Sequence, residues 1–463
     1  MKEYIQKLQK EFANTPDLII KNFKINPLHK IYVVFLETLC SQDKINDYVL
    51  KSLTNKKTLK NIESEIPGGN VIKLAKYDLC ESFLYNGFTL IIDGKDIYAI
   101  ETKGDLTRSV TTNETEPALK GPKNAFVESY QTNIGLVKRR IRSSHLKIKN
   151  LNIGRLSNNP VGILYIDNIT KPELVQKVYD KLKKIDTDLL CSIESLISYL
   201  GDKSHFPTVI TTERPDRCAE ALAEGKIVII CDESPFALIV PAFLIDFINP
   251  FSDKYAKSLN INFTKLIRFL CFFLSAVVPA FYIAIINYNQ EAIPTSLIIN
   301  FAIQREGVPF PAIIECIIML VICEILRESD LRFPSKYGSA ISILGALVLG
   351  DAAVNAGLVS PIMIIITAFT YISSLIFTEA EIGNALRNYR FLFLVMSAFF
   401  GLYGLFVTLL FFLVNLVNTS SLGYPYTFPA SPYDKSYFKE FLFKRKNKTR
   451  SPILSKNKTK EQE

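Results

Sequence analysis

The chain has 463 residues, of which 48% are hydrophobic and 21% are charged, and its mean hydropathy is +0.18. This apolar fraction excludes a disordered chain, and 54 basic and 45 acidic residues exclude one that lies in a membrane along its whole length. Residues 1–264 and 419–463 carry net charges of +4 and +6, whereas residues 265–418 carry −1, which predicts a soluble region, an apolar membrane block and a basic tail.

The cysteines and the N-terminus predict the compartment of the soluble region. The eight cysteines form no CxxC pair, so we interpret them as reduced, buried small side chains, and with three histidines we expect no zinc site. The first twenty residues contain no apolar stretch of signal-peptide length, and the first long apolar run follows residue 264. We therefore expect residues 1–264 to be cytoplasmic.

Two stretches of the soluble region have the same order of elements. Residues 31–39 predict a buried strand and residues 42–54 an amphipathic helix; later, residues 161–167 and 171–184 repeat this pair.

A second correspondence supports a duplication. Sliding the sequence by 138 aligns CESFLYNGFTLII (80–92) with CAEALAEGKIVII (218–230), so that a cysteine, a glycine and an Ile-Ile pair coincide. We infer two repeated α/β subdomains. The alternative is that two α/β units resemble one another by chance, and different strand orders in the two units would indicate it.

The fold class predicted is an α/β soluble N-terminal region of two repeated subdomains, followed by an all-α polytopic membrane domain. The expected units are an N-terminal extension at 1–27, α/β subdomain 1 at 28–120, a basic connecting helix at 121–154, α/β subdomain 2 at 155–262, the transmembrane domain at 265–418 and a basic C-terminal tail at 419–463.

The connecting helix is strongly basic at its far end, where Lys138, Arg139, Arg140 and Arg142 cluster. From charge alone, three interpretations remain open: a solvated helix face, a patch for phosphate or lipid headgroups, and an ion-pairing surface for a partner subunit. Nucleic acid is not an expected partner, because the soluble region is weakly basic and shows no known nucleic-acid module.

The membrane block contains five apolar segments, at 266–287, 308–326, 338–357, 360–378 and 391–418. A spanning helix needs about 20 mostly apolar residues. The segment 308–326 carries Glu315 and Glu324, so we expect it to be a re-entrant or interfacial helix, preceded by a short helix over 295–304.

This gives four spans, and the basic tail predicts a cytoplasmic C-terminus by the positive-inside rule. The same scheme places a smaller set of cations on the outside: Arg327, Arg332, Lys336, Arg387 and Arg390.

The segment 338–357 has two distinct helical faces. A helix-packing stripe of small residues contains Ser342, Ala346, Gly350, Ala353 and Gly357. The opposite, pore-lining face contains Leu344, Val348, Asp351 and Asn355. Such a helix suits a ring of identical subunits around a pore, and equally a buried helix whose Asp351 is neutralised within one subunit.

Several motifs resemble one family. They are GPKNAFVESYQTNIGLVKRRIR (121–142), FPTVITTERPDRCAEALAEGKIVIICDESPFALIVP (206–241), IPTSLIINFAIQREGVPFPAIIE (293–315), ISILGALVLGDAAVNAGLVSP (341–361) and SLGYPY (421–426). From about residue 30 to 428 the chain resembles the A subunits of GerA-type nutrient germinant receptors of spore-forming bacteria. It departs from the family pattern at Cys191–Ser195 and at Asp351.

The resemblance implies a multi-pass receptor subunit in the spore inner membrane, with the N-terminal domain and the tail in the spore core. It implies a transporter-like B subunit and a lipoprotein C subunit as partners, and a pentamer of this chain that conducts monovalent cations. It also implies a coupling motif of Arg305, Glu306, Gly307, Pro309, Pro311 and Glu315. Among the three interpretations of the basic helix, the resemblance favours a subunit interface, made by Glu128, Asn133, Arg139, Arg140 and Arg142.

The sequence contains no nucleophile–base pair, Walker loop or metal cluster, so we expect neither an enzyme nor a cofactor. The function predicted is a nutrient-gated cation channel that triggers germination. The alternatives are a secondary transporter, a non-conducting signalling scaffold and the family paralogue tied to dipicolinate release.

Overall fold

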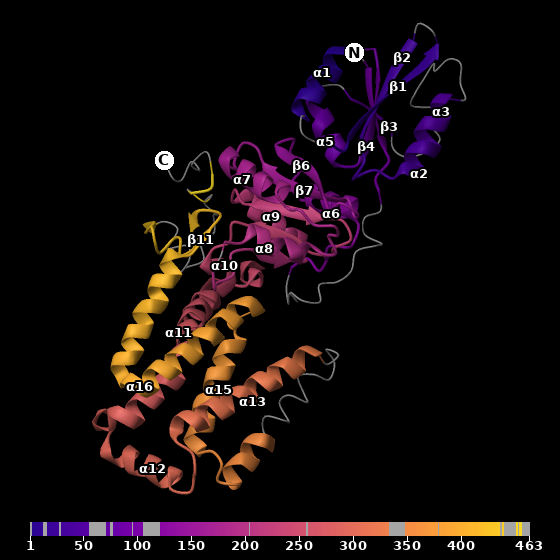
Figure 1. The fold of residues 1–463 in the computed structure, drawn as a ribbon. Coiled ribbons are helices and arrows are strands. Elements are labelled where there is room, and N and C mark those ends of the chain that lie inside the picture. Colours follow the sequence, from indigo (N-terminus) through magenta and orange to yellow (C-terminus); the bar gives the residue numbers. More distant parts are fainter. Residues whose placement is uncertain are drawn as a thin grey trace.

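In the computed structural model, two domains and a helical part follow one another, and the C-terminal segment runs back to the second domain (Figure 1). Domain 1 (residues 2–104) is followed by domain 2 (121–255), then by the helical part (258–418), and the C-terminal segment (419–455) lies against domain 2. The residues that the structure describes are 2–12, 16–26, 29–54, 71–74, 77–94, 96–104, 121–202, 204–255, 258–332, 348–377, 379–435, 438, 451 and 453–455.

Domain 1 is an antiparallel sheet between two helical layers, with the strand order β1-β2-β4-β5-β3. On β2, Val33 and Phe35 face one layer, whereas Val34 and Leu36 face the other, as the alternation of side chains along a strand requires. The elements are α1 (Lys2–Glu11), β1 (Leu18–Asn26), β2 (His29–Leu36), α2 (Gln42–Lys44), η1 (Ile45–Leu50), α3 (Lys51–Thr54), β3 (Val71–Leu74), η2 (Tyr77–Leu79), α5 (Cys80–Tyr85), β4 (Phe88–Asp93) and β5 (Asp96–Glu101).

Domain 2 has the same strand order, β6-β7-β9-β10-β8, and is again antiparallel. Helices α6 and α9 cover one face of the sheet, and α7 with α8 covers the other. The elements are α6 (Tyr130–Lys138), β6 (Leu146–Ile153), β7 (Asn159–Ile166), α7 (Pro172–Lys183), η3 (Ile193–Leu196), α8 (Ile197–Leu200), β8 (Ile210–Thr212), α9 (Pro215–Ala223), β9 (Ile227–Cys231), β10 (Ala237–Val240), α10 (Leu244–Ile248) and η4 (Phe251–Tyr255).

The identical strand orders confirm the two repeated subdomains. The aligned residues also play the same parts: Cys80 and Cys218 are fully buried, and Gly87 and Gly225 have φ values of +80° and +94°. Each glycine follows a helix and begins the return into a central strand, where a left-handed conformation costs little only for a residue without Cβ. The shared sequence pattern therefore encodes a shared turn.

Each repeat is longer than the sequence analysis expects. β1 and β6 begin before residues 28 and 155, so each sheet draws its first strand from the segment that precedes its expected unit. The basic connecting helix is α6, which packs against α9 and precedes β6 as α1 precedes β1. It therefore belongs to domain 2.

Among the described residues of the helical part, two helices are long and apolar enough to cross a membrane, Ile261–Tyr288 and Glu381–Asn418, and a shorter apolar helix is Pro361–Leu375. Its elements are α11 (Ser258–Tyr288), η5 (Gln290–Ala292), α12 (Thr295–Arg305), α13 (Ala312–Arg332), a helix over 348–355, α15 (Pro361–Leu375) and α16 (Ala380–Asn418). α12 matches the short helix expected at 295–304. Residues 338–347 of the two-faced segment lie outside the described residues.

α16 is a hairpin of two helical arms, where the sequence analysis expects a single span at 391–418. Its two arms meet at Gly401, whose φ and ψ are +58° and −140° (Figure 1). Both ends lie at domain 2, because Glu379 pairs with Arg217 at 2.7 Å and Thr419 bonds Ser204 at 3.1 Å. A Cβ on residue 401 would come within 3.0 Å of Tyr288, so the turn is packed tightly against the far end of α11.

α13 runs parallel to α15 along its length. The re-entrant or interfacial placement expected for 308–326 stays a prediction. Glu315 near its start contacts Ser360 just before α15, and Arg327 donates to the Ser374 hydroxyl near the end of α15 at 3.3 Å. Both glutamates of this segment, Glu315 and Glu324, are paired with groups from other helices or their ends.

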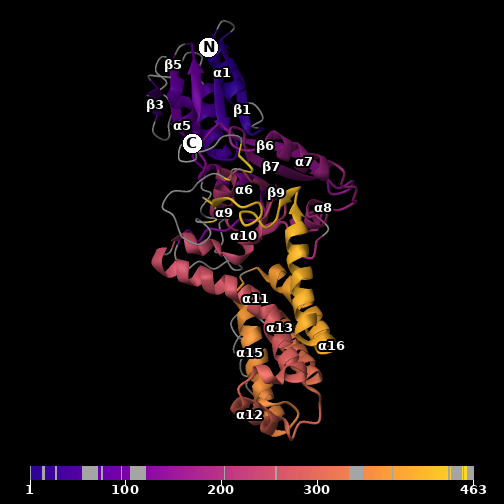
Figure 2. The ribbon, with the colours of Figure 1, turned by 90° about the vertical axis from the view of Figure 1, so that its left-hand side faces the viewer.

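The C-terminal segment packs onto domain 2, with β11 (Ser420–Ser421) and β12 (Tyr424–Pro425) forming a short hairpin. The Ser421 hydroxyl donates to the Thr208 carbonyl at 2.7 Å, and Ser455 bridges to Thr170. The described ends of the soluble regions thus lie on one side of the helical part (Figure 2).

A buried ion pair ties the two domains together. The Lys138 ammonium at the end of α6 donates to the Asp17 carboxylate at the start of β1, and these side chains are 0% and 5% exposed. The Thr38 hydroxyl donates to the second Asp17 oxygen at 2.6 Å. A buried charge without its partner costs much more than an exposed one, so this contact constrains how the domains sit together.

We expect Lys138→Met to destabilise the packing of domain 1 by about 3–5 kcal/mol, because it leaves the Asp17 carboxylate buried and unpaired. The measurement is maleimide labelling of the buried Cys40 and Cys80 in increasing urea, read by mass spectrometry of the peptides. Lys51→Met is the matched control: its pair with Asp47 is exposed, where solvent screens the attraction, so this replacement should leave the labelling transition almost unchanged. Equal shifts in both variants would contradict the assignment.

Candidate functional site

The described end of the two-faced segment forms a helix over 348–355 whose polar face is free. Val348 is 58% exposed, and Asp351 and Asn355 are also exposed. On the other face Gly350 is buried, and a Cβ there would lie 3.9 Å from the Ile364 side chain on α15. Within one chain, the small face therefore packs against α15 and leaves the polar face for water or for another molecule.

Ser342, Leu344 and Ala346 lie outside the described residues. Ala353 is partly buried and packs against the cluster formed by α11, α13 and α15.

Gly357 ends this helix and does not continue the stripe. Its φ is +65°, and its amide donates to the Val354 carbonyl while the Leu358 amide donates to the Ala353 carbonyl, both at 2.9 Å. These two bonds are the Schellman pattern, in which a glycine in the left-handed conformation closes a helix. A Cβ on residue 357 would lie 3.2 Å from the Gly307 carbonyl, so the helix end touches the predicted coupling motif.

The centre of that motif is the carboxylate of Glu315, which is fully buried. One of its oxygens accepts from the Ser360 amide at 3.0 Å and from the Ser360 hydroxyl at 2.8 Å. The other lies 3.4 Å from a guanidinium nitrogen of Arg305, at the end of α12. We call Arg305, Gly307, Glu315, Gly357 and Ser360 the hub: it joins α12 and α13 to the chain between the 348–355 helix and α15.

The remaining members of the coupling motif stay outside the hub. Glu306, Pro309 and Pro311 are exposed. Pro311 directly precedes α13, and its carbonyl accepts from the amides of Ile314 and Glu315, so it begins that helix.

The predicted interface residues of α6 divide into buried and exposed groups. Asn133 is fully buried, where its amide group exchanges hydrogen bonds with the backbone of Val127. Arg140 is partly buried and donates to the Asn124 side chain at 2.8 Å. Glu128 and Arg142 are exposed and Arg139 is partly exposed. An intersubunit contact stays a prediction, and these last three residues are the ones free to make it.

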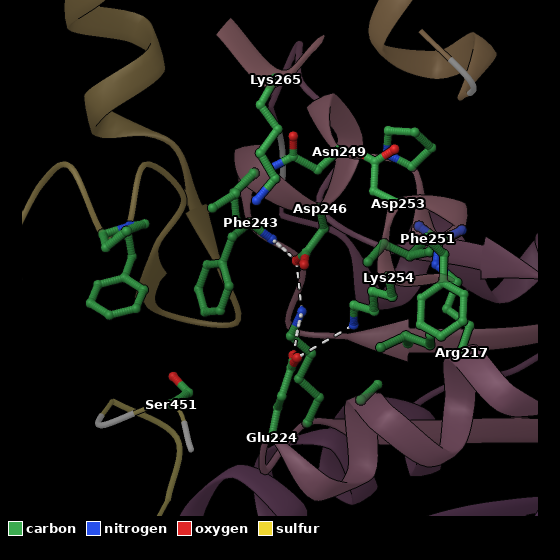
Figure 3. Close-up of a pocket in the computed structure, with 18 of the residues that line it drawn as sticks. Arg217, Glu224, Phe243, Asp246, Asn249, Phe251, Asp253, Lys254, Lys265 and Ser451 are labelled. Atoms are coloured by element: carbon green, nitrogen blue, oxygen red, sulfur yellow. Dashed lines mark hydrogen bonds and ion pairs between the residues drawn. The ribbon is translucent and has the colours of Figure 1, made fainter. Parts of the chain in front are cut away.

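A cavity of about 190 Å³ lies where domain 2 meets α11 and the C-terminal segment (Figure 3). Lys226 lies between Asp246 at 2.7 Å and Glu224 at 3.7 Å, and Lys254 reaches Glu224 at 3.8 Å. Lys265 at the start of α11 and Ser451 of the C-terminal segment line the same space. The sequence analysis missed this junction, because it is assembled from segments more than a hundred residues apart.

The part of the chain that the structure describes contains no cluster of histidine, cysteine and acidic side chains placed to hold a metal ion. In the hub and at the domain 2 junction, charged side chains from different elements are paired, so these sites can hold the elements together and couple their movements.

Comparison with known proteins identifies the relatives of this chain. Residues 6–457 match the family described as Bacillus/Clostridium GerA spore germination protein. Spore germination protein KA of Bacillus subtilis (strain 168) is 36% identical over 95% of this chain and 83% of its own length. Spore germination protein GerQA of Bacillus cereus is 32% identical over 98% of this chain and 93% of its own length.

A solved structure is also similar. It is the crystal structure of the N-terminal domain of the A subunit of the Bacillus megaterium spore germinant receptor GerK3. It is 27% identical, covers 53% of this chain and 96% of its own, and gives a TM-score of 0.41.

We expect Glu315→Ala to lower the stability of the helical part by about 2–4 kcal/mol, because the two Ser360 donors lose their acceptor and the Arg305 guanidinium loses its ion-pair partner. The measurement is the temperature at which buried thiols such as Cys316 react with a fluorescent maleimide, in detergent and in a Cys191→Ser background. Glu306→Ala removes an exposed acid of the same motif and should leave the midpoint unchanged. A midpoint that falls equally in both variants would show that the hub adds no stability.

Proposed function

The chain belongs to the GerA family of spore germination proteins, and from this premise we propose that it is the A subunit of a nutrient germinant receptor. In this proposal several copies, five by family resemblance, form a cation channel in the spore inner membrane. The channel works with a transporter-like B subunit and a lipoprotein C subunit, and nutrient opens it to monovalent cations.

One observation supports the channel most directly: the 348–355 helix has one face packed within its own chain and a polar face left exposed. Val348, Asp351 and Asn355 lie on that exposed face, at positions that recur on one side of a helix. In a ring of copies, an apolar side chain constricts a pore by dewetting, and a ring of carboxylates concentrates cations.

We expect Asp351→Asn to lower cation conductance severalfold and to move the reversal potential under a salt gradient toward zero, since the carboxylate ring is lost. Reconstituted channels recorded in planar bilayers give both quantities. Asp351→Glu keeps the charge and is the matched control, which should keep selectivity. An unchanged reversal potential in Asp351→Asn at normal expression would remove this residue from the pore.

The same preparation separates the rival functions. Exchange of a labelled solute without net current would indicate a secondary transporter. Absence of both in a folded, reconstituted receptor would indicate a scaffold.

We also propose that both soluble ends lie on the spore-core side. The contacts of Glu379, Thr419 and Ser421 with domain 2 support this, because a helical part that begins and ends at domain 2 crosses a membrane an even number of times. This keeps both soluble ends on the cytoplasmic side, as the sequence analysis expects. It replaces the four expected spans with a larger even number, because α13 and each arm of α16 are counted as separate spans.

Cys191 provides the test, because it is exposed, in contrast to the expectation that all eight cysteines are buried. Burial raises the pKa of the Cys231 thiol to about 12 and also raises that of Cys40, so these thiols react slowly. We expect a membrane-impermeant maleimide to label Cys191 only in inside-out vesicles. Tyr433→Cys, at an exposed position of the C-terminal segment, should label from the same side; labelling from opposite sides would overturn the arrangement.

A further inference from the structure

Three arginines gather around one carboxylate where the helical part meets domain 2. Arg387 lies 3.2 Å from Glu324, Arg327 lies 3.7 Å from it, and Arg390 lies 3.9 Å from it. In the part of the chain that the structure describes, Glu324 is the carboxylate paired with all three. We call Arg327, Arg387 and Arg390 the arginine cluster; its charge exceeds that of Glu324 by two.

The cluster is enclosed and incompletely satisfied. The Arg390 side chain is 2% exposed; its Nε donates to the Ser275 carbonyl at 2.7 Å, and its Nη2 has no hydrogen-bond partner among the described residues. An unpaired buried guanidinium N–H is costly, so the site is short of an acceptor. Arg327 and Arg387 are 19% and 36% exposed, which leaves an approach from outside.

The position of the cluster indicates what supplies that acceptor. Arg327 donates to Ser374, at the end of α15 that leads to the Arg217–Glu379 contact with domain 2. The same stretches of α13, α15 and α16 expose large apolar side chains: Ile325 is 59% exposed, Leu375 is 55% exposed and Leu392 is 37% exposed. An anion bound here would have its charge among guanidinium groups and an apolar body against these side chains.

We propose that the arginine cluster binds the phosphate of an anionic phospholipid in the leaflet next to domain 2. A guanidinium group binds phosphate oxygens through paired, charge-assisted hydrogen bonds. Basic pockets between transmembrane helices on the cytoplasmic side are sites where lipid headgroups bind. The proposal rests on the membrane placement given above but not on ion conduction.

The test is native mass spectrometry of the full-length protein taken from vesicles of equimolar phosphatidylcholine and phosphatidylglycerol with matched acyl chains. We expect the wild-type protein to retain phosphatidylglycerol preferentially, and Arg387→Gln to reduce that preference about fivefold. Arg387 is chosen because it is the most exposed of the three, so its replacement disturbs packing least. Arg387→Lys keeps the charge and should retain part of the preference.

Arg155→Gln is the matched control, because Arg155 is an exposed arginine of domain 2 paired with Asp186. Its preference should equal that of the wild type. An equal loss in both variants, or a full preference in Arg387→Gln, overturns the site.

A second measurement in this test is the thermal unfolding temperature of the protein in inorganic phosphate without anionic lipid. Stabilisation there, with no lipid preference, would overturn the lipid assignment in favour of a soluble phosphate. A protein that shows the lipid preference but conducts no ions would keep this site while removing the proposed channel.

Discussion

A small aromatic cluster holds the helical part to domain 2. Phe206 of domain 2 stacks on Tyr389 with ring centroids 5.4 Å apart and on Tyr426 at 6.0 Å, and Tyr389 meets Phe412 edge-on at 4.9 Å. Tyr389 and Phe412 lie on opposite arms of α16, so one cluster fixes the start and the return of the hairpin. Each such pair contributes about 0.5–1.5 kcal/mol beyond the area that it buries. The out-and-back path of the chain depends on this contact, and α11 packs along the hairpin that it anchors.

The packing of these helices also determines which partners the buried charged side chains of the helical part meet. α13 carries Glu315 and Glu324, separated by about 14 Å along the helix axis at a rise of 1.5 Å per residue. Glu315 meets Arg305 and Ser360 at the end away from domain 2, whereas Glu324 meets the arginine cluster at the near end. A carboxylate among apolar helices is tolerated when other elements bring donors to it. The two glutamates therefore fix both ends of the apolar stretch of α13 that lies between them.

Local patterns predicted the repeat, because Cys80, Gly87, Cys218 and Gly225 each act through their own turn or helix. Features that depend on distant partners were not accessible in this way. The residues near Lys138 in the sequence do not indicate that it pairs with Asp17. Glycines are tolerated within membrane helices, so the sequence around Gly401 is also that of a single continuous span, although the chain reverses there.

Gly357 shows that sequence spacing can mislead even over a few residues. Its spacing fits a packing stripe, but its amide donates one of the hydrogen bonds that end the helix. The exposed face from Val348 to Asn355 was predictable from periodicity alone. In the proposed channel, this face would meet other copies of the chain.

The hub explains how a signal could reach that face in the proposed channel. The described helix 348–355 has its Schellman end at Gly357 against the Gly307 carbonyl, while Ser360 is held by Glu315. A displacement of α12 moves Arg305 and Gly307 together, because they are two residues apart at the end of that helix. The closed helix end cannot absorb the movement by lengthening, since a residue in the left-handed conformation does not continue an α-helix. The movement is therefore passed to the helix as a whole, and with it to the exposed face that carries Asp351.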